Sequence, residues 1–286
     1  MDIFGVVGNS LGLIKKHPKF LFPALIIYIA MLVVGTIIAA LVIAGIAAHA
    51  ISFPITSSTD LVHAYLPLAA AILITVMVAG LLAGAYVNGT YIALASQSAS
   101  SNASISPALK RASERYFDLL IYSALVLVVR IIIALALLGP VAYIGYHSLL
   151  RPYIEGMPIS WPSATGFIAL AAVFGIIYLI VQLVASIMLS MGGPAVVLDG
   201  KGPSQALIRS IAIGKKDFSR LAGFLVIVFI VAVVINAIGG LLGIIPLIGF
   251  ILSFAADIVA FTFMQLAVPM YYIYFHTLPR RRAATQ

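Results

Sequence analysis

The sequence contains no cysteine, a single tryptophan and very few charged residues. Without cysteine, the chain can form no disulfide, no thiolate metal site and no cysteine nucleophile. Only 8% of its 286 residues are charged and 63% are hydrophobic, whereas soluble proteins carry about 25% charged residues. So few polar side chains cannot cover a water-soluble fold, and the high apolar content excludes a disordered chain. The composition therefore predicts a protein whose main solvent is lipid.

Six apolar runs are long enough to cross a bilayer as helices, which takes about 20 residues each. They lie roughly at 20–48, 65–96, 118–146, 163–191, 219–243 and 247–275. Long continuous runs are typical of helices, because membrane-spanning strands give weak alternating segments of about 10 residues. We therefore predict an all-α fold: a single integral membrane domain over 1–286 with six transmembrane helices.

The basic residues predict the orientation of these spans. Of the 16 Lys and Arg residues, all but Arg130 and Arg151 lie before the first span, after the sixth, or in the loops that follow the second and fourth spans. By the positive-inside rule, both termini then face the cytoplasm of a multi-pass protein in the cell membrane. Because the formal charge of +8 is divided among membrane-adjacent loops, we expect no nucleic-acid partner.

A short amphipathic segment precedes each odd-numbered span, at 2–17, 106–117 and 203–216. Apolar residues recur at helical spacing in each of them; in the third, Leu207, Ile208 and Ile211 are expected to face lipid or core. The second and third segments also share an Ala-Leu-x-Arg-small pattern. These features predict interfacial helices and a threefold pseudo-repeat with units of about 1–98, 99–198 and 199–286. The alternative is that the segments are unrelated, because any polytopic membrane protein alternates loops and spans in this way as a result of its topology.

The polar faces of these segments are basic, which predicts contact with the phosphates of anionic lipids. The residues expected to meet lipid headgroups are Lys15, Lys16, Lys110, Arg111, Arg209, Lys215 and Lys216. The simpler alternative is that each interfacial helix only orients the span that follows it. Membrane lipids are the predicted partners, together with further copies of the chain or other membrane subunits.

Two charged residues, Arg130 and Asp257, fall near the middle of the third and sixth spans. A lone charge at that depth costs at least about 2.5–3.5 kcal/mol, so equal depth predicts an intramembrane Arg130–Asp257 pair. The pair either clamps two spans together or provides a proton relay, ion or anion site.

Four uncharged polar residues also lie inside the spans, where such side chains are more typical of interhelical hydrogen bonds than of substrate contacts. They are Asn88, Gln182, Asn236 and Gln265.

No motif indicates catalysis: the sequence has no P-loop, dinucleotide fingerprint, G-x-S-x-G elbow or paired carboxylates within one span. We therefore expect a non-enzymatic protein without a cofactor. His49, His63 and His147 map to the outer side with Asp60 and Glu155. Their spacing requires no metal site, and separate solvated histidines are the simpler interpretation.

Two stretches carry a resemblance to a known family. Residues 16–23, Lys-His-Pro-Lys-Phe-Leu-Phe-Pro, resemble the start of the membrane-domain-like family associated with glycerophosphodiester phosphodiesterases, which includes YciC-like bacterial inner-membrane proteins and archaeal relatives. The more specific match is Gly-Pro-Ala-Val-Val-Leu-Asp-Gly at 193–200, followed by 206–210 and Asp217-Phe218. The resemblance implies a six-span membrane protein. The soluble phosphodiesterase domain of some members is absent, so it implies no hydrolase activity.

These observations favour a non-enzymatic membrane scaffold, complex subunit or lipid-interacting protein. The alternative is a transporter or channel for a small solute, ion or lipid that uses the Arg130–Asp257 pair. An intramembrane enzyme acting on lipids is the weakest interpretation, because no chemical motif supports it. A continuous polar cavity that reaches Arg130 would support transport, and a dry, fully packed interior would contradict it.

Overall fold

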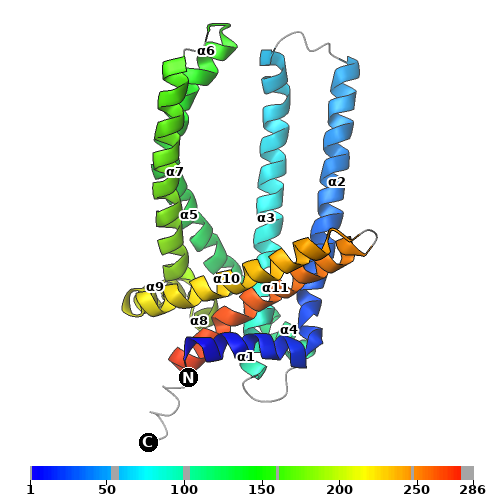
Figure 1. The fold of residues 1–286 in the computed structure, drawn as a ribbon, viewed down its shortest axis with the longest axis vertical. Coiled ribbons are helices and arrows are strands. Elements are labelled where there is room, and N and C mark those ends of the chain that lie inside the picture. Colours follow the sequence, from blue (N-terminus) through cyan, green and yellow to red (C-terminus); the bar gives the residue numbers. More distant parts are fainter. Residues whose placement is uncertain (1, 53–57, 99–103, 159–160, 246–247, 278–286) are drawn as a thin grey trace, which may run out of the picture. The chain divides into compact units, whose positions relative to one another are not determined.

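A computed structural model describes residues 2–52, 58–98, 104–158, 161–245 and 248–277, and these ranges contain helices and no strand (Figure 1). The elements, in chain order, are α1 (Ile3–Lys16), η1 (Pro18–Leu21), α2 (Phe22–Ser52), α3 (Ser58–Ser98), α4 (Ile105–Glu114), α5 (Tyr116–Gly145), η2 (Tyr146–Leu150), α6 (Arg151–Ile154), α7 (Trp161–Leu189), α8 (Gly192–Asp199), α9 (Pro203–Lys216), α10 (Phe218–Leu242), α11 (Gly249–Tyr272) and η3 (Ile273–Thr277). The predicted all-α class is confirmed.

Six helical stretches of the described ranges are long and apolar enough to cross a membrane, as the sequence predicts. They are Pro18–Ala40, Ala70–Ser98, Tyr116–Ile154, Ala164–Asp199, Phe218–Leu242 and Gly249–Thr277. Helix α3 is much longer than its apolar stretch, with 41 residues. At about 1.5 Å per residue it is roughly 60 Å long, about twice the thickness of the hydrocarbon core. Part of α3 therefore extends beyond the lipid interior.

The chain forms two compact units. The first contains Met1–Val33, Leu81–Ser123 and Ile187–Gln286, and the second contains Val34–Gly80 and Ala124–Ser186. The boundaries fall inside α2, α3, α5 and α7. In the described ranges, every Lys and Arg except Arg130 and Arg151 belongs to the first unit. The single domain and the three repeat units stay predictions.

All three predicted amphipathic segments are separate helices, α1, α4 and α9, in the first unit. Helix α9 begins with Pro203 at its first turn, where the missing proline N–H costs nothing. It buries small residues, including Ala206 and Ser210, while Ile208 is 68% exposed. Gly214 allows the close approach, because a Cβ there would lie 2.8 Å from the Cα of Met188. The placement of these helices at a membrane surface stays a prediction.

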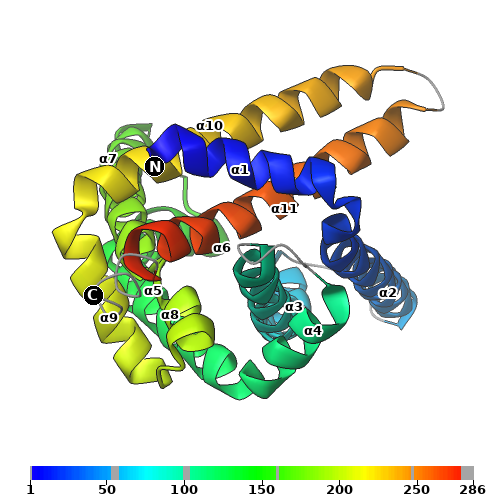
Figure 2. The ribbon, with the colours of Figure 1, turned by 90° about the horizontal axis from the view of Figure 1, so that it is seen from below.

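The core of the first unit joins helices that are far apart in the sequence. The buried Tyr91 hydroxyl lies 3.1 Å from each of three groups: the Phe20 carbonyl, the Ala24 N–H and the Thr262 hydroxyl. It thereby connects α3 to the start of α2 and to α11. Helix α11 also packs along α10 and against α1 (Figure 2). The Phe224 and Tyr271 rings, 4.7 Å apart, fill part of the α10–α11 contact.

The turn between α7 and α8 depends on a close approach that only glycine allows. Tyr122 donates a hydrogen bond from its hydroxyl to the Leu189 carbonyl. A Cβ on Gly192 would lie only 2.1 Å from the Tyr122 ring. The first residue of α8 is therefore a glycine for steric reasons.

The second unit exposes much more of its apolar surface. Large side chains such as Leu73, Leu135, Ile168 and Leu179 are each at least 64% exposed. A water-soluble protein rarely leaves contiguous apolar surface of this kind uncovered. This surface is the one expected of helices that face lipid or other membrane-embedded segments.

Candidate functional site

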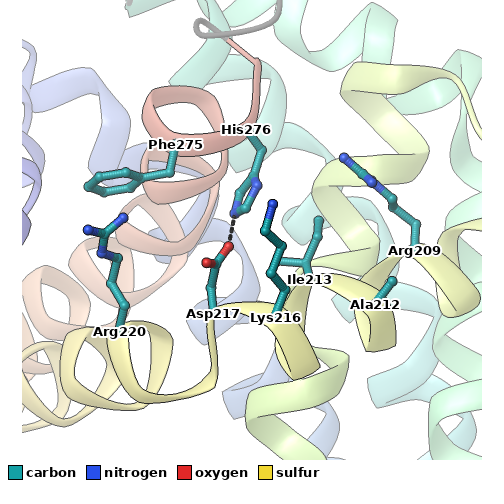
Figure 3. Close-up of a pocket in the computed structure, with 8 residues that line it drawn as sticks. All are labelled: Arg209, Ala212, Ile213, Lys216, Asp217, Arg220, Phe275 and His276. Atoms are coloured by element: carbon teal, nitrogen blue, oxygen red, sulfur yellow. Dashed lines mark ion pairs between the residues drawn. The ribbon is translucent and has the colours of Figure 1, made fainter.

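A basic pocket lies in the first unit, where α9 ends, α10 begins and η3 follows the last long helix (Figure 3). Its volume is about 400 Å³, and its lining residues are Arg209, Ala212, Ile213, Lys216, Asp217, Arg220, Phe275 and His276. We call it the basic pocket. It is large enough for a small ligand, since ligand sites occupy about 300–1,000 Å³.

Helical periodicity brings the cations of the basic pocket together. Arg209, Ile213 and Lys216 follow one face of α9 at spacings of four and three residues. The helix ends at Asp217, which has non-helical backbone angles (φ −113°, ψ 26°), and α10 starts at the next residue. Arg220, one turn into α10, continues the same face across this break. The opposite wall comes from Phe275 and His276 of the π-helical turn η3.

Two interactions, an ion pair and a cation–π contact, join the opposite walls of the basic pocket. The Nε2 atom of His276 lies 3.8 Å from an Asp217 carboxylate oxygen, which is within ion-pair range and longer than a hydrogen bond. The guanidinium carbon of Arg220 lies 5.2 Å from the centre of the Phe275 ring, in a cation–π contact. Figure 3 shows the Lys216 ammonium beside the His276 ring.

Within the part of the chain that the structure describes, two nitrogens of the lining residues are buried and have no hydrogen-bond partner: Nε of Arg209 and Nε2 of His276. A buried donor without a partner costs about 1–3 kcal/mol, so such groups are normally satisfied. Three permanent cations also face a single carboxylate, that of Asp217, among the lining residues. The basic pocket therefore offers unused donors and excess positive charge, which suits an anion.

A polar network supports the Arg209 side of the pocket. The Tyr272 hydroxyl donates a hydrogen bond to the Asp199 carboxylate at the end of α8. The charges of Asp199 and Arg209 both act on this hydroxyl. Gly200 then ends α8 in a left-handed conformation (φ 65°), which favours glycine. The network fixes the end of α11 and α9 to α8, and so helps to hold the pocket in shape.

A second polar pocket, of about 360 Å³, lies between α4 and the end of α8. Arg111 and Arg115 line it together with Glu114 and Asp199, so its charges balance. Arg111 donates a hydrogen bond to the Val197 carbonyl at 3.3 Å. These arginines are therefore engaged in joining α4 to α8 and in local pairing.

The residues predicted to meet lipid headgroups fall into two groups. Arg209 and Lys216 line the basic pocket. The others are exposed on the three amphipathic helices: Lys15, Lys16, Lys110, Arg111 and Lys215.

The predicted intramembrane charges lie in different units. Arg130, in the second, has an exposed side chain that donates a hydrogen bond to the Ser186 hydroxyl at 3.3 Å. Gln182 donates to the Arg130 carbonyl at 3.4 Å and to the Tyr178 hydroxyl at 3.2 Å. Asp257 belongs to the first unit, where its charge acts on Tyr28. The Arg130–Asp257 pair stays a prediction.

The other polar residues of the spans occupy different environments. Asn88 lies against α8, because a Cβ on Gly193 would be 3.4 Å from its amide nitrogen. Gln265 is half-buried in α11, and Asn236 is exposed on α10. These positions do not converge on the basic pocket.

Two of the five residues predicted to lie on the outer side have partners of their own. His147 packs against the Tyr143 ring with the centroids 4.5 Å apart, and Glu155 pairs with Arg151 at 2.8 Å. The side chains of the remaining three, His49, Asp60 and His63, lie outside the described residues.

Comparison with known proteins gives no relative from which to transfer a function: no family model, curated protein or solved structure matches the chain. The resemblance to the membrane-domain-like family associated with glycerophosphodiester phosphodiesterases therefore stays a prediction.

The sequence indicates only part of the basic pocket. The helical spacing of charged residues in α9 indicates Arg209 and Lys216. Arg220 follows at the same spacing if the helical register is continued past Asp217. No sequence signal marks His276, because it lies 60 residues after Lys216 and reaches the pocket through the packing of α11 on α10.

Proposed function

We propose that the protein is a non-enzymatic multi-pass protein of the cell membrane that binds anionic lipids and serves as a lipid-organising scaffold or complex subunit. The observation that carries this proposal is the basic pocket beside the end of the last apolar helix, with its buried, unpartnered donors. In this proposal both termini face the cytoplasm, and the basic pocket lies at the cytoplasmic surface of the bilayer. Further copies or other membrane subunits are the protein partners it implies.

The amphipathic helices and the helix that follows α4 support this placement. Phe4 on α1, Phe117 at the start of α5 and Ile208 on α9 are 69%, 74% and 68% exposed. Each lies in a segment that also exposes lysine or arginine. Exposed apolar side chains next to cations are typical of helices at the headgroup boundary, where the apolar group enters the lipid and the cation meets a phosphate.

The proposal is tested by the thermal unfolding of the purified full chain in micelles doped with phosphatidylglycerol or phosphatidylcholine. Each Lys or Arg near an anionic surface contributes about 1 kcal/mol, so phosphatidylglycerol is expected to raise the unfolding midpoint. At about 1 M salt the Debye length is about 3 Å, so the part of this rise in the unfolding midpoint that is due to exposed cations is expected to disappear. Equal midpoints in the two lipids at low salt would contradict lipid binding.

Transport is the second candidate, and the polar cluster of the second unit favours it. Tyr178, Gln182 and Ser186 follow one face of α7 at spacings of four residues, and Arg130 joins them from α5. Polar side chains at membrane depth often mark ion or solute pathways. Proteoliposomes loaded with a pH-sensitive dye test for proton movement. Transport predicts a flux that Arg130→Gln abolishes, whereas a flux equal to that of empty liposomes would exclude a proton pathway.

A further inference from the structure

The basic pocket carries more charge than a monovalent lipid headgroup can neutralise. Among the lining residues that the structure describes, with His276 neutral, three permanent cations and one carboxylate leave a net charge of two positive units. We propose that the pocket selects a phosphate monoester, the group that terminates lipids such as phosphatidic acid. This inference rests on the proposed function, because it names the headgroup class that the lipid-binding surface prefers.

The charge balance separates the headgroup classes. A phosphate monoester carries about −1.5 to −2 at pH 7 and matches the two positive units. A phosphate diester such as phosphatidylglycerol carries one negative charge, so one of the two positive charges of the pocket stays unmatched. With a zwitterionic headgroup, both positive charges stay unmatched. Arg209 and Asp217 are half-buried, and partly buried charges are screened less than exposed ones, so an unmatched charge beside them is costly.

The donors of the pocket also suit a terminal phosphate. Arg209 and Arg220 present planar guanidinium groups, which bind phosphate oxygens through paired hydrogen bonds, and Lys216 adds a compact charge. The buried Nε of Arg209 is a further donor, as is Nε2 of His276 when protonated, and neither atom has a hydrogen-bond partner among the described residues. A monoester has three terminal oxygens to accept these bonds, whereas a diester has two oxygens that are not esterified.

The size and position of the pocket favour a lipid source over a bare ion. A volume of about 400 Å³ corresponds to roughly a dozen waters at about 30 Å³ each, which exceeds the space that one phosphate needs. The wall formed by Phe275 and His276 directly follows the apolar helix α11. A lipid phosphate could therefore enter while its acyl chains stay beside the helix. Soluble phosphate monoesters share the chemistry and are the other source.

The test is isothermal titration calorimetry on the purified full chain in a neutral detergent. The probes are dioctanoyl phosphatidic acid, dioctanoyl phosphatidylglycerol and glycerol 3-phosphate. Phosphatidic acid is expected to bind about tenfold more tightly than phosphatidylglycerol. The double variant Lys216→Gln/Arg220→Gln is expected to lose this preference. Both side chains are exposed, and a thermal melt verifies that the variant is folded.

The matched control is Lys19→Gln, which removes an exposed lysine of the first unit that does not line the pocket. It is expected to leave the preference unchanged. Equal affinities for the two lipids would overturn the inference while the proposed function stands, and binding of neither lipid would overturn both. Binding of glycerol 3-phosphate as tight as that of phosphatidic acid would support the monoester class and assign a soluble source. Loss of the preference in Lys19→Gln as well would overturn the role of the pocket.

Discussion

Replacing Tyr91 by phenylalanine tests whether its hydroxyl holds the first unit together. This hydroxyl contacts the Phe20 carbonyl, the Ala24 N–H and the Thr262 hydroxyl, each at 3.1 Å. All of these residues are fully buried. Tyr91→Phe keeps the ring and removes only the oxygen, so it leaves one donor, one acceptor and one hydroxyl without their common partner.

The expected loss of stability follows from these three groups. A buried polar group that loses its partner costs about 1–3 kcal/mol. Interhelical hydrogen bonds in membrane proteins average about 0.6 kcal/mol, with a maximum near 1.7, because local rearrangement finds other partners. Three affected groups at intermediate values give a destabilisation of about 2–3 kcal/mol. Thr262→Val removes only one of the three contacts and is expected to cost about 1 kcal/mol.

The measurement is reversible unfolding of the purified protein in mixed micelles, by denaturant or by steric trapping. Tyr86→Phe is the matched control, because Tyr86 lies on the same helix and is exposed. It is expected to stay within about 0.5 kcal/mol of the wild type, as surface substitutions do. A value for Tyr91→Phe that is no larger than that of Tyr86→Phe would refute the reasoning.

Three further predictions concern other parts of the chain. Gly239→Val is expected to destabilise the α10–α11 hairpin by about 1–3 kcal/mol in the same unfolding assay, because a Cβ there would lie 2.4 Å from the Cβ of Ala256. An unchanged unfolding midpoint would contradict this packing. Asp217→Asn removes the one carboxylate that the described residues contribute to the lining of the basic pocket. Calorimetry should therefore show about tenfold tighter binding of phosphatidylglycerol, and weaker binding would refute the charge argument. Arg130→Leu removes an exposed charge whose guanidinium donates a hydrogen bond to Ser186. If lipid surrounds this position, the variant should be at least as stable as the wild type. A loss of more than about 3 kcal/mol in the free energy of unfolding would instead indicate a buried ionic partner.

The sequence was sufficient for the helices and insufficient for their packing. Continuous apolar runs and amphipathic segments predict the long helices and α1, α4 and α9, because both signals are local. The short helix α8 was missed as an element. Its eight residues are mostly small and buried, and they depend on the clearance that Gly192 gives to Tyr122.

The residues that line the basic pocket likewise divide into those that the sequence predicts and those that depend on packing. Arg209 and Lys216 were predictable because charge on an amphipathic helix is visible in the sequence. Asp217, Phe275 and His276 were not, because they become neighbours only through the antiparallel packing of α10 and α11. The Arg130–Asp257 pair rests on equal predicted depth alone, and depth in a span does not specify which helices adjoin.

The basic pocket joins the start of α10 to the turn that follows α11, the two ends of one helical hairpin. During synthesis, Arg209 and Lys216 leave the ribosome about 60 residues before His276, which at about 5–20 residues per second is a delay of several seconds. In that interval the cations of α9 have no opposite wall. The pocket is completed only when α11 has packed against α10, so a ligand that needs both walls would bind only chains in which this hairpin has closed.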